Sequence, residues 1–125
     1  MKKRSKTDFL LCIAVVLCLS QCFRIGDEQT SDVCVSEASS RTITYEADVQ
    51  AIMSADCLQC HSNPATQGAS QPLTTFAEVN NQYATIKDYI SRPAGDSKHM
   101  PVGYSLEECE IFQIIKYETD GFLEN

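Results

Sequence analysis

Two cysteines and a histidine stand close together in the stretch Cys57-Leu58-Gln59-Cys60-His61. Two thiols three residues apart occupy neighbouring positions of a helical turn, so both can add to the two vinyl groups of one haem. The histidine that follows directly is then placed to face the iron. This C-x-x-C-H pattern is typical of a covalently attached c-type haem.

Two other chemistries use similar residues. A redox dithiol of the thioredoxin kind lies at the end of a strand in a βαβ unit, and this sequence shows no such alternation of strands and helices. A structural zinc site could combine Cys57, Cys60, His61 and His99, but the chain has no second C-x-x-C pair and no H-x-x-x-H pair. A chance match also stays open, and haem attachment is the interpretation that we favour.

A haem iron needs a sixth ligand or keeps an open position, and the chain has only two histidines. Met100 precedes Pro101 in the stretch 92–103, whose prolines and glycines indicate a loop. Proline biases the preceding residue toward an extended conformation, which suits a loop laid across a haem face. We therefore predict Met100 as the distal ligand. His99 is the competitor for this role and is otherwise expected to be a solvated loop residue.

Three segments have helical patterns. The first covers residues 45–53, with apolar side chains at helical spacing and acids in its first turn, and runs into Cys57. The second carries an apolar stripe from Leu73 to Ile90, with an interruption expected at Asn80-Asn81. The third begins with a capping box at residues 105–108 and is closed by Gly121. The sequence predicts an all-α fold of three to four helices with loop-rich connections.

The N-terminal residues 1–21 have the pattern of an export signal. Four basic residues in the first six positions precede an apolar run of eleven residues, Phe9 to Leu19, which is too short to span a bilayer. The following Leu19-Ser20-Gln21-Cys22 resembles the bacterial lipobox, which implies that Cys22 is acylated and becomes the mature N-terminus. Ordinary secretion and processing at Cys18 are the alternatives. Residues 22–41 are polar, without hydrophobic periodicity, and are expected to form a tether.

Charge and cysteine content narrow the function further. Four of the ten basic residues and one of the seventeen acidic residues precede residue 22, so six basic and sixteen acidic residues remain, a net charge near −10. Nucleic acid is excluded as a partner, because the chain has no basic patch. Cys34 and Cys109 are the cysteines without another role, and export to an oxidising compartment predicts a disulfide between them. Cys109 could instead be a core residue.

The helix before Cys57, the Cys57–His61 motif, the stretch His99-Met100-Pro101 and the last helix together resemble the small single-haem cytochrome c domain of bacterial exported proteins. The resemblance covers about residues 45–122 of an expected domain over 42–125. It implies a fold around one haem c, with His61 and Met100 as proximal and distal iron ligands. It also implies one-electron transfer rather than enzyme activity.

These features predict a lipid-anchored protein of the bacterial cell envelope that faces the periplasm. Which membrane holds it is open, and the cell surface is a further option. The partners expected are redox proteins with basic docking surfaces. Two alternatives remain: a haem-based module that binds or senses NO or CO, and an electron-entry subunit of a larger oxidoreductase. A peroxidase is disfavoured, because no distal His and Arg pair is placed for it.

Overall fold

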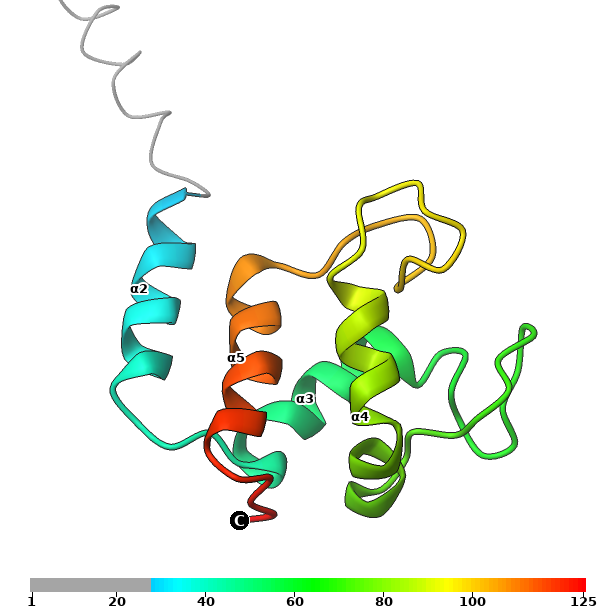
Figure 1. The fold of residues 1–125 in the computed structure, drawn as a ribbon, viewed down its shortest axis with the longest axis horizontal. Coiled ribbons are helices and arrows are strands. Elements are labelled where there is room, and N and C mark those ends of the chain that lie inside the picture. Colours follow the sequence, from blue (N-terminus) through cyan, green and yellow to red (C-terminus); the bar gives the residue numbers. More distant parts are fainter. Residues whose placement is uncertain (1–27) are drawn as a thin grey trace, which may run out of the picture. The chain divides into compact units, whose positions relative to one another are not determined.

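The computed structural model describes residues 28–125, and every regular element in that part of the chain is a helix. Helix α2 spans Glu28–Ser39, and a second helix runs from Tyr45 to Cys57. Helices α4 and α5 span Phe76–Ile90 and Glu108–Thr119 (Figure 1). The prediction of an all-α fold is confirmed for this part of the chain.

The predicted export signal and the predicted acylation site Cys22 lie outside the described residues. Among the helices that are described, none has the length and apolar character required to cross a bilayer.

The helix that leads to the cysteine motif is wound in three short segments. Two π-helical turns, η1 (Tyr45–Val49) and η2 (Met53–Cys57), enclose the α-helical turn α3 (Gln50–Ile52). The N–H of Leu58 closes the last turn on the carbonyl of Met53 at 2.9 Å. The helix predicted over 45–53 is therefore present and continues further, so that Cys57 is its last residue.

Helix α4 buries the predicted apolar stripe but starts later than the pattern suggested. Thr75 caps it: its hydroxyl accepts the N–H of Glu78 at 3.3 Å, and the Glu78 carboxylate accepts the N–H of Thr75 at 3.0 Å. The expected interruption at Asn80-Asn81 is wrong, because the helix is continuous. The Asn80 amide oxygen accepts a hydrogen bond from the Tyr117 hydroxyl at 2.7 Å, so this polar residue links α4 to α5.

Helix α5 also starts later than predicted. Its first turn is capped at Glu107, whose N–H donates to the Glu110 carboxylate at 2.9 Å. The predicted capping box at residues 105–108 is wrong, because the Ser105 hydroxyl lies 3.2 Å from a ring nitrogen of His99 instead. The prediction that Gly121 ends the helix is confirmed. Its φ is 96°, a backbone conformation that residues with a Cβ atom rarely adopt.

The core lies where the Tyr45–Cys57 helix crosses α5 (Figure 1), and η1 packs directly against α5. The two ends of the domain are also joined, because the N–H groups of Tyr45 and Glu46 donate to the carbonyls of Leu123 and Glu124 at 2.8 and 2.9 Å. Aromatic rings fill the space between the helices in edge-to-face contacts. The most deeply buried side chains are Ile43, Val49, Met53, Val79, Ile114 and Tyr117.

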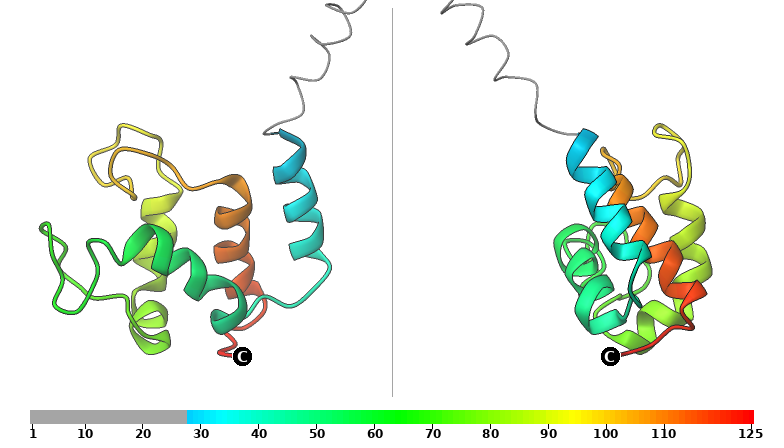
Figure 2. Two further views of the ribbon diagram at one scale, coloured as in Figure 1. Left: turned by 180° about the vertical axis from the view of Figure 1, so that it is seen from behind. Right: turned by 90° about the vertical axis from the view of Figure 1, so that its left-hand side faces the viewer.

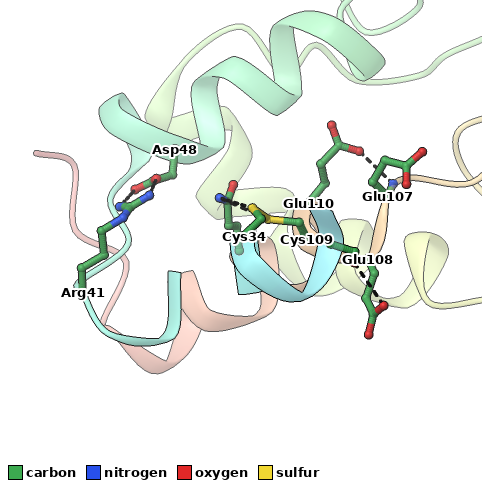
Figure 3. Close-up of a disulfide and its surroundings, with 9 residues drawn as sticks. Cys34, Arg41, Asp48, Glu107, Glu108, Cys109 and Glu110 are labelled. Atoms are coloured by element: carbon green, nitrogen blue, oxygen red, sulfur yellow. Dashed lines mark hydrogen bonds and ion pairs between the residues drawn. A yellow bond between two sulfur atoms is a disulfide. The ribbon is translucent and has the colours of Figure 1, made fainter. Parts of the chain in front are cut away.

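Helix α2 corrects the prediction of an unstructured tether over residues 22–41. Residues 28–39 are helical, although within the part whose side chains are described only Ala38 is fully buried. A disulfide joins Cys34 to Cys109, with the two Cα atoms 5.9 Å apart (Figure 3). The Ser31 hydroxyl adds a hydrogen bond to Glu108 at 3.3 Å. A cross-link to a residue 75 positions away holds this helix, so its own sequence pattern did not reveal it.

An ion pair fixes the chain where it enters the first core helix. Arg41 donates to the buried carboxylate of Asp48, with Nη1 3.0 Å from Oδ2 (Figure 3), and the N–H of Thr44 donates to the same oxygen at 3.0 Å. Burial alone would raise the pKa of Asp48, but the hydrogen bonds from Arg41 and Thr44 and the charge of Arg41 lower it overall.

The lowered pKa of Asp48 predicts a pH dependence of folding. Because the folded pKa lies below the unfolded value, the stabilisation is complete above about pH 5 and is lost as the pH falls through the folded pKa. We expect Asp48→Asn to reduce the free energy of unfolding by roughly 1 to 3 kcal/mol at neutral pH. The difference from the wild type should shrink as the pH falls through the folded pKa of Asp48.

Urea denaturation followed by circular dichroism at several pH values measures this difference. Asp32→Asn, at an exposed position of α2, is the matched control and should leave the curves unchanged. A pH-independent difference between Asp48→Asn and the wild type would contradict the assignment.

Candidate functional site

The two motif cysteines lie at the end of the first core helix. The N–H groups of Cys60 and His61 donate to the carbonyl of Cys57 at 3.2 and 2.9 Å, so the chain continues in a tight turn through the motif. Both cysteines are free thiols and both are half-buried. They are therefore available for covalent attachment to a group beside the helix.

The loop after the motif is closed on itself. The N–H of Leu73 donates to the carbonyl of His61 at 2.8 Å, and the N–H of Thr66 donates to the carbonyl of Cys60 at 2.8 Å. The two ends of the stretch 61–73 are thus joined by the backbone. This closure holds His61 in place without placing it in a helix.

The ring of His61 is oriented by a backbone oxygen. Its Nδ1 lies 2.7 Å from the carbonyl of Gln71. A carbonyl can only accept, so Nδ1 carries a proton and the lone pair of the neutral ring is on Nε2. Metal-bound histidines show this arrangement, in which the other nitrogen donates to an oxygen that fixes the tautomer and the ring orientation.

Met100 lies in the second long loop, residues 91–107, and its N–H donates to the carbonyl of Tyr89 at 3.2 Å. This loop and the one after the cysteine motif extend from the same side of the helices, opposite α2 (Figure 2). The Tyr104 hydroxyl donates to Asp56 at 3.0 Å, one residue before Cys57. The structure thereby connects the loop of Met100 to the end of the helix that carries the cysteines.

His99 is not the solvated loop residue that we expected. It is 7% exposed, and its Nδ1 lies 2.7 Å from the carbonyl of Arg92. Its Nε2 lies 3.0 Å from the carbonyl of Tyr104 and 3.2 Å from the Ser105 hydroxyl. A carbonyl oxygen can only accept, so in a neutral ring Nδ1 donates to the Arg92 carbonyl and Nε2 accepts from the Ser105 hydroxyl, with the Tyr104 carbonyl close by. Neither nitrogen is free to ligate iron in this arrangement.

The surroundings of Cys57 disfavour this residue as the nucleophile of a redox dithiol. Burial raises the pKa of its thiol to about 12, with further contributions from the negative charges of Asp56 and Glu110. Reactive dithiols instead need a thiol with a lowered pKa, because the thiolate is the nucleophile. This environment keeps Cys57 protonated at neutral pH.

A zinc site also lacks support. Within residues 28–125, no three histidine, cysteine, aspartate or glutamate side chains come close enough together to hold a metal ion. The proposed fourth ligand, His99, has both nitrogens bound elsewhere. The ligands of a haem iron, one imidazole and one thioether on two separate loops, are a different donor set and fit the residues present.

The sequence did not predict that three backbone carbonyls would contact the histidine rings. Those of Gln71, Arg92 and Tyr104 orient the two histidine rings, and every residue type provides such an oxygen. The contact between Tyr104 and Asp56 joins residues 48 positions apart and has no local pattern either. No sequence signal marked these positions.

Comparison of the chain with protein-family models, with curated proteins and with solved structures gave no match. The interpretation of this site therefore depends on the chemistry of its own residues.

The raised pKa of Cys57 predicts slow alkylation in the folded chain before haem attachment. At about pH 8, a thiol with a pKa near 12 is roughly a thousandfold less ionised than one with an ordinary value near 9. We expect iodoacetamide to modify Cys57 at least roughly a hundredfold more slowly in the folded than in the denatured chain. Mass spectrometry of Cys60→Ser, in which Cys57 is the only free motif thiol, measures both rates; equal rates would contradict the prediction.

Proposed function

We propose that this protein is a single-haem c-type cytochrome that transfers one electron at a time. The observation that carries the proposal is the arrangement at the motif: two free thiols on one turn, followed by a histidine whose Nδ1 is bound to the Gln71 carbonyl at 2.7 Å. A lone pair is then available at Nε2 of His61 for iron. The helices would form a cytochrome c-like fold around the haem.

Each residue of the site has a separate task in this proposal. Cys57 and Cys60 would hold the haem by thioether bonds, and His61 and Met100 would ligate its iron. The haem supplies an iron that cycles between ferrous and ferric states. A thioether is a soft ligand that favours the ferrous form, so Met100 would raise the reduction potential compared with a second imidazole.

The buried helix faces would exclude water from the haem. The stripe Val79, Tyr83, Ile86 and Ile90 of α4 belongs to the same apolar cluster as Met53, and Cys57 and Leu58 pack against that cluster. Apolar surroundings disfavour the additional charge of ferric haem and so raise its potential. The same residues form the hydrophobic core, so their packing would both stabilise the fold and exclude water from the haem.

The location and partners of this carrier follow from its sequence. We propose acylation of Cys22, attachment to a membrane of the bacterial envelope and exposure to the periplasm. A domain with sixteen acidic and six basic residues from residue 22 onward would meet basic partners fastest, because opposite charges accelerate encounter. The partners would therefore be redox proteins with basic docking surfaces, alone or within a larger oxidoreductase.

A test for covalently attached haem is the decisive experiment. The full chain, produced in a bacterium with a cytochrome c maturation system, should retain haem stain on a denaturing gel after acid–acetone extraction. Cys57→Ala and Cys60→Ala should each weaken the stain, and the double variant should abolish it. The double variant Cys34→Ala/Cys109→Ala removes the disulfide cysteines and should keep the stain. An unstained wild-type band would overturn the proposal.

The near-infrared spectrum of the ferric haem tests whether Met100 is an iron ligand. We expect Met100→Ala to lose the weak near-infrared band of methionine-ligated ferric haem and to lower the reduction potential by on the order of 100 mV. Haem attachment should not change. Met53→Leu, a substitution at a methionine buried in the core, is the matched control and should keep the band. Loss of the band in Met53→Leu but not in Met100→Ala would move the ligand role away from Met100.

A further inference from the structure

We propose that His99 is a positioning residue that clasps the two ends of the Met100 loop and so holds Met100 ready to ligate iron. The inference rests on the proposed function, because it assigns a role to the neighbour of the proposed distal ligand. It concerns a residue that is not itself one of the proposed iron ligands.

The geometry of the clasp is a bridge across the loop. Arg92 opens the stretch and Tyr104 and Ser105 end it, and the ring of His99 contacts all three. The contact distances are 2.7 Å to the Arg92 carbonyl, 3.0 Å to the Tyr104 carbonyl and 3.2 Å to the Ser105 hydroxyl. The His99 ring thus links Arg92 to Tyr104 and Ser105, which lie twelve and thirteen positions further along the sequence.

The other hydrogen bonds inside the loop lie within residues 92–99, and the Tyr104 hydroxyl bonds to Asp56 outside the loop, so the His99 ring is what joins its two ends. Between Ser91 and Ser105, His99 is the only buried residue, and the rest of the stretch is exposed or half-buried. A loop of this kind cannot gain rigidity from an apolar core, so its few buried polar contacts determine its conformation. The next residue, Met100, is bound to α4 only through its N–H and the Tyr89 carbonyl at 3.2 Å.

The position of His99 also explains why Met100 and not His99 is the proposed ligand. The two neighbours differ in their surroundings, because the His99 ring is buried and hydrogen-bonded whereas Met100 is half-buried. The ring is held by the Arg92 carbonyl, which accepts from Nδ1, and by the Ser105 hydroxyl, which donates to Nε2. The thioether of Met100 stays half-buried and makes no hydrogen bond of its own.

The test compares His99→Ala with the wild-type protein in two measurements. The first is the rate at which CO binds the ferrous haem, which requires displacement of Met100. The second is hydrogen exchange of the amides of His99 and Met100 in the reduced full-length protein. Loss of the clasp should raise both rates roughly tenfold to hundredfold, as expected for the loss of two hydrogen bonds to a buried ring. The near-infrared band should weaken while covalent haem remains.

Two variants control for unspecific effects. Ser105→Ala removes one contact of the ring and should produce a smaller change in the same direction. Lys98→Ala lies next to His99 but changes only an exposed side chain, and both rates should stay at the wild-type values. The amides of Ile114 and Tyr117 in α5 report on the whole core and should keep their protection in every variant.

Three results would overturn the clasp. The first is wild-type exchange at His99 and Met100 in His99→Ala. The second is an equal acceleration in Lys98→Ala. The third is a loss of protection in α5 as large as that in the loop for both His99→Ala and Ser105→Ala, since His99 would then support the whole fold. A wild-type chain without covalent haem would overturn the proposed function instead, and hydrogen exchange of that chain would still decide on the clasp.

Discussion

The crossing of the Tyr45–Cys57 helix over α5 is the contact on which the rest of the structure depends. It buries Val49, Ile114 and Tyr117 almost completely, and the backbone of Tyr45 is tied to Leu123 near the C-terminus. Truncating one such large core side chain costs roughly 3 to 5 kcal/mol, against a total stability of about 5 to 15 kcal/mol for a domain. The cysteine motif begins where this helix ends, so its position is set by the crossing.

The loops obtain their order in a different way. They bury few side chains, and hydrogen bonds replace the missing core: the Gln71 carbonyl orients His61, whereas the Arg92 carbonyl and the Ser105 hydroxyl hold His99. Each such bond contributes only about 0.5 to 1.5 kcal/mol, but breaking one in a buried position leaves a polar group unpaired, which costs more. The two proposed iron ligands therefore lie on segments whose conformation depends on a small number of hydrogen bonds.

Helix α2 shows what a covalent cross-link adds to a weak element. An isolated helix of about twelve residues is marginal in water, and this one buries little apolar surface against the domain. A disulfide between residues 75 positions apart lowers the conformational entropy of the unfolded chain, which stabilises the folded state by roughly 4 kcal/mol. Within the stretch 22–41 predicted as a tether, residues 28–39 are consequently more ordered than their polar composition indicated.

The sequence by itself determined the helical class, the burial of the α4 stripe, the closure at Gly121 and the residues of the candidate haem site. Local spacing was sufficient for these, because apolar periodicity and the C-x-x-C-H motif are encoded by neighbouring residues. Only the tertiary structure decided the start of α5, the helical state of residues 28–39 and the burial of His99. Each of these depends on a partner far along the chain or on a backbone oxygen: Ser105 contacts His99 instead of capping α5, and Cys109 holds Cys34. Local patterns carry no record of such partners, because any residue can supply a carbonyl and any distance along the chain can be closed by folding.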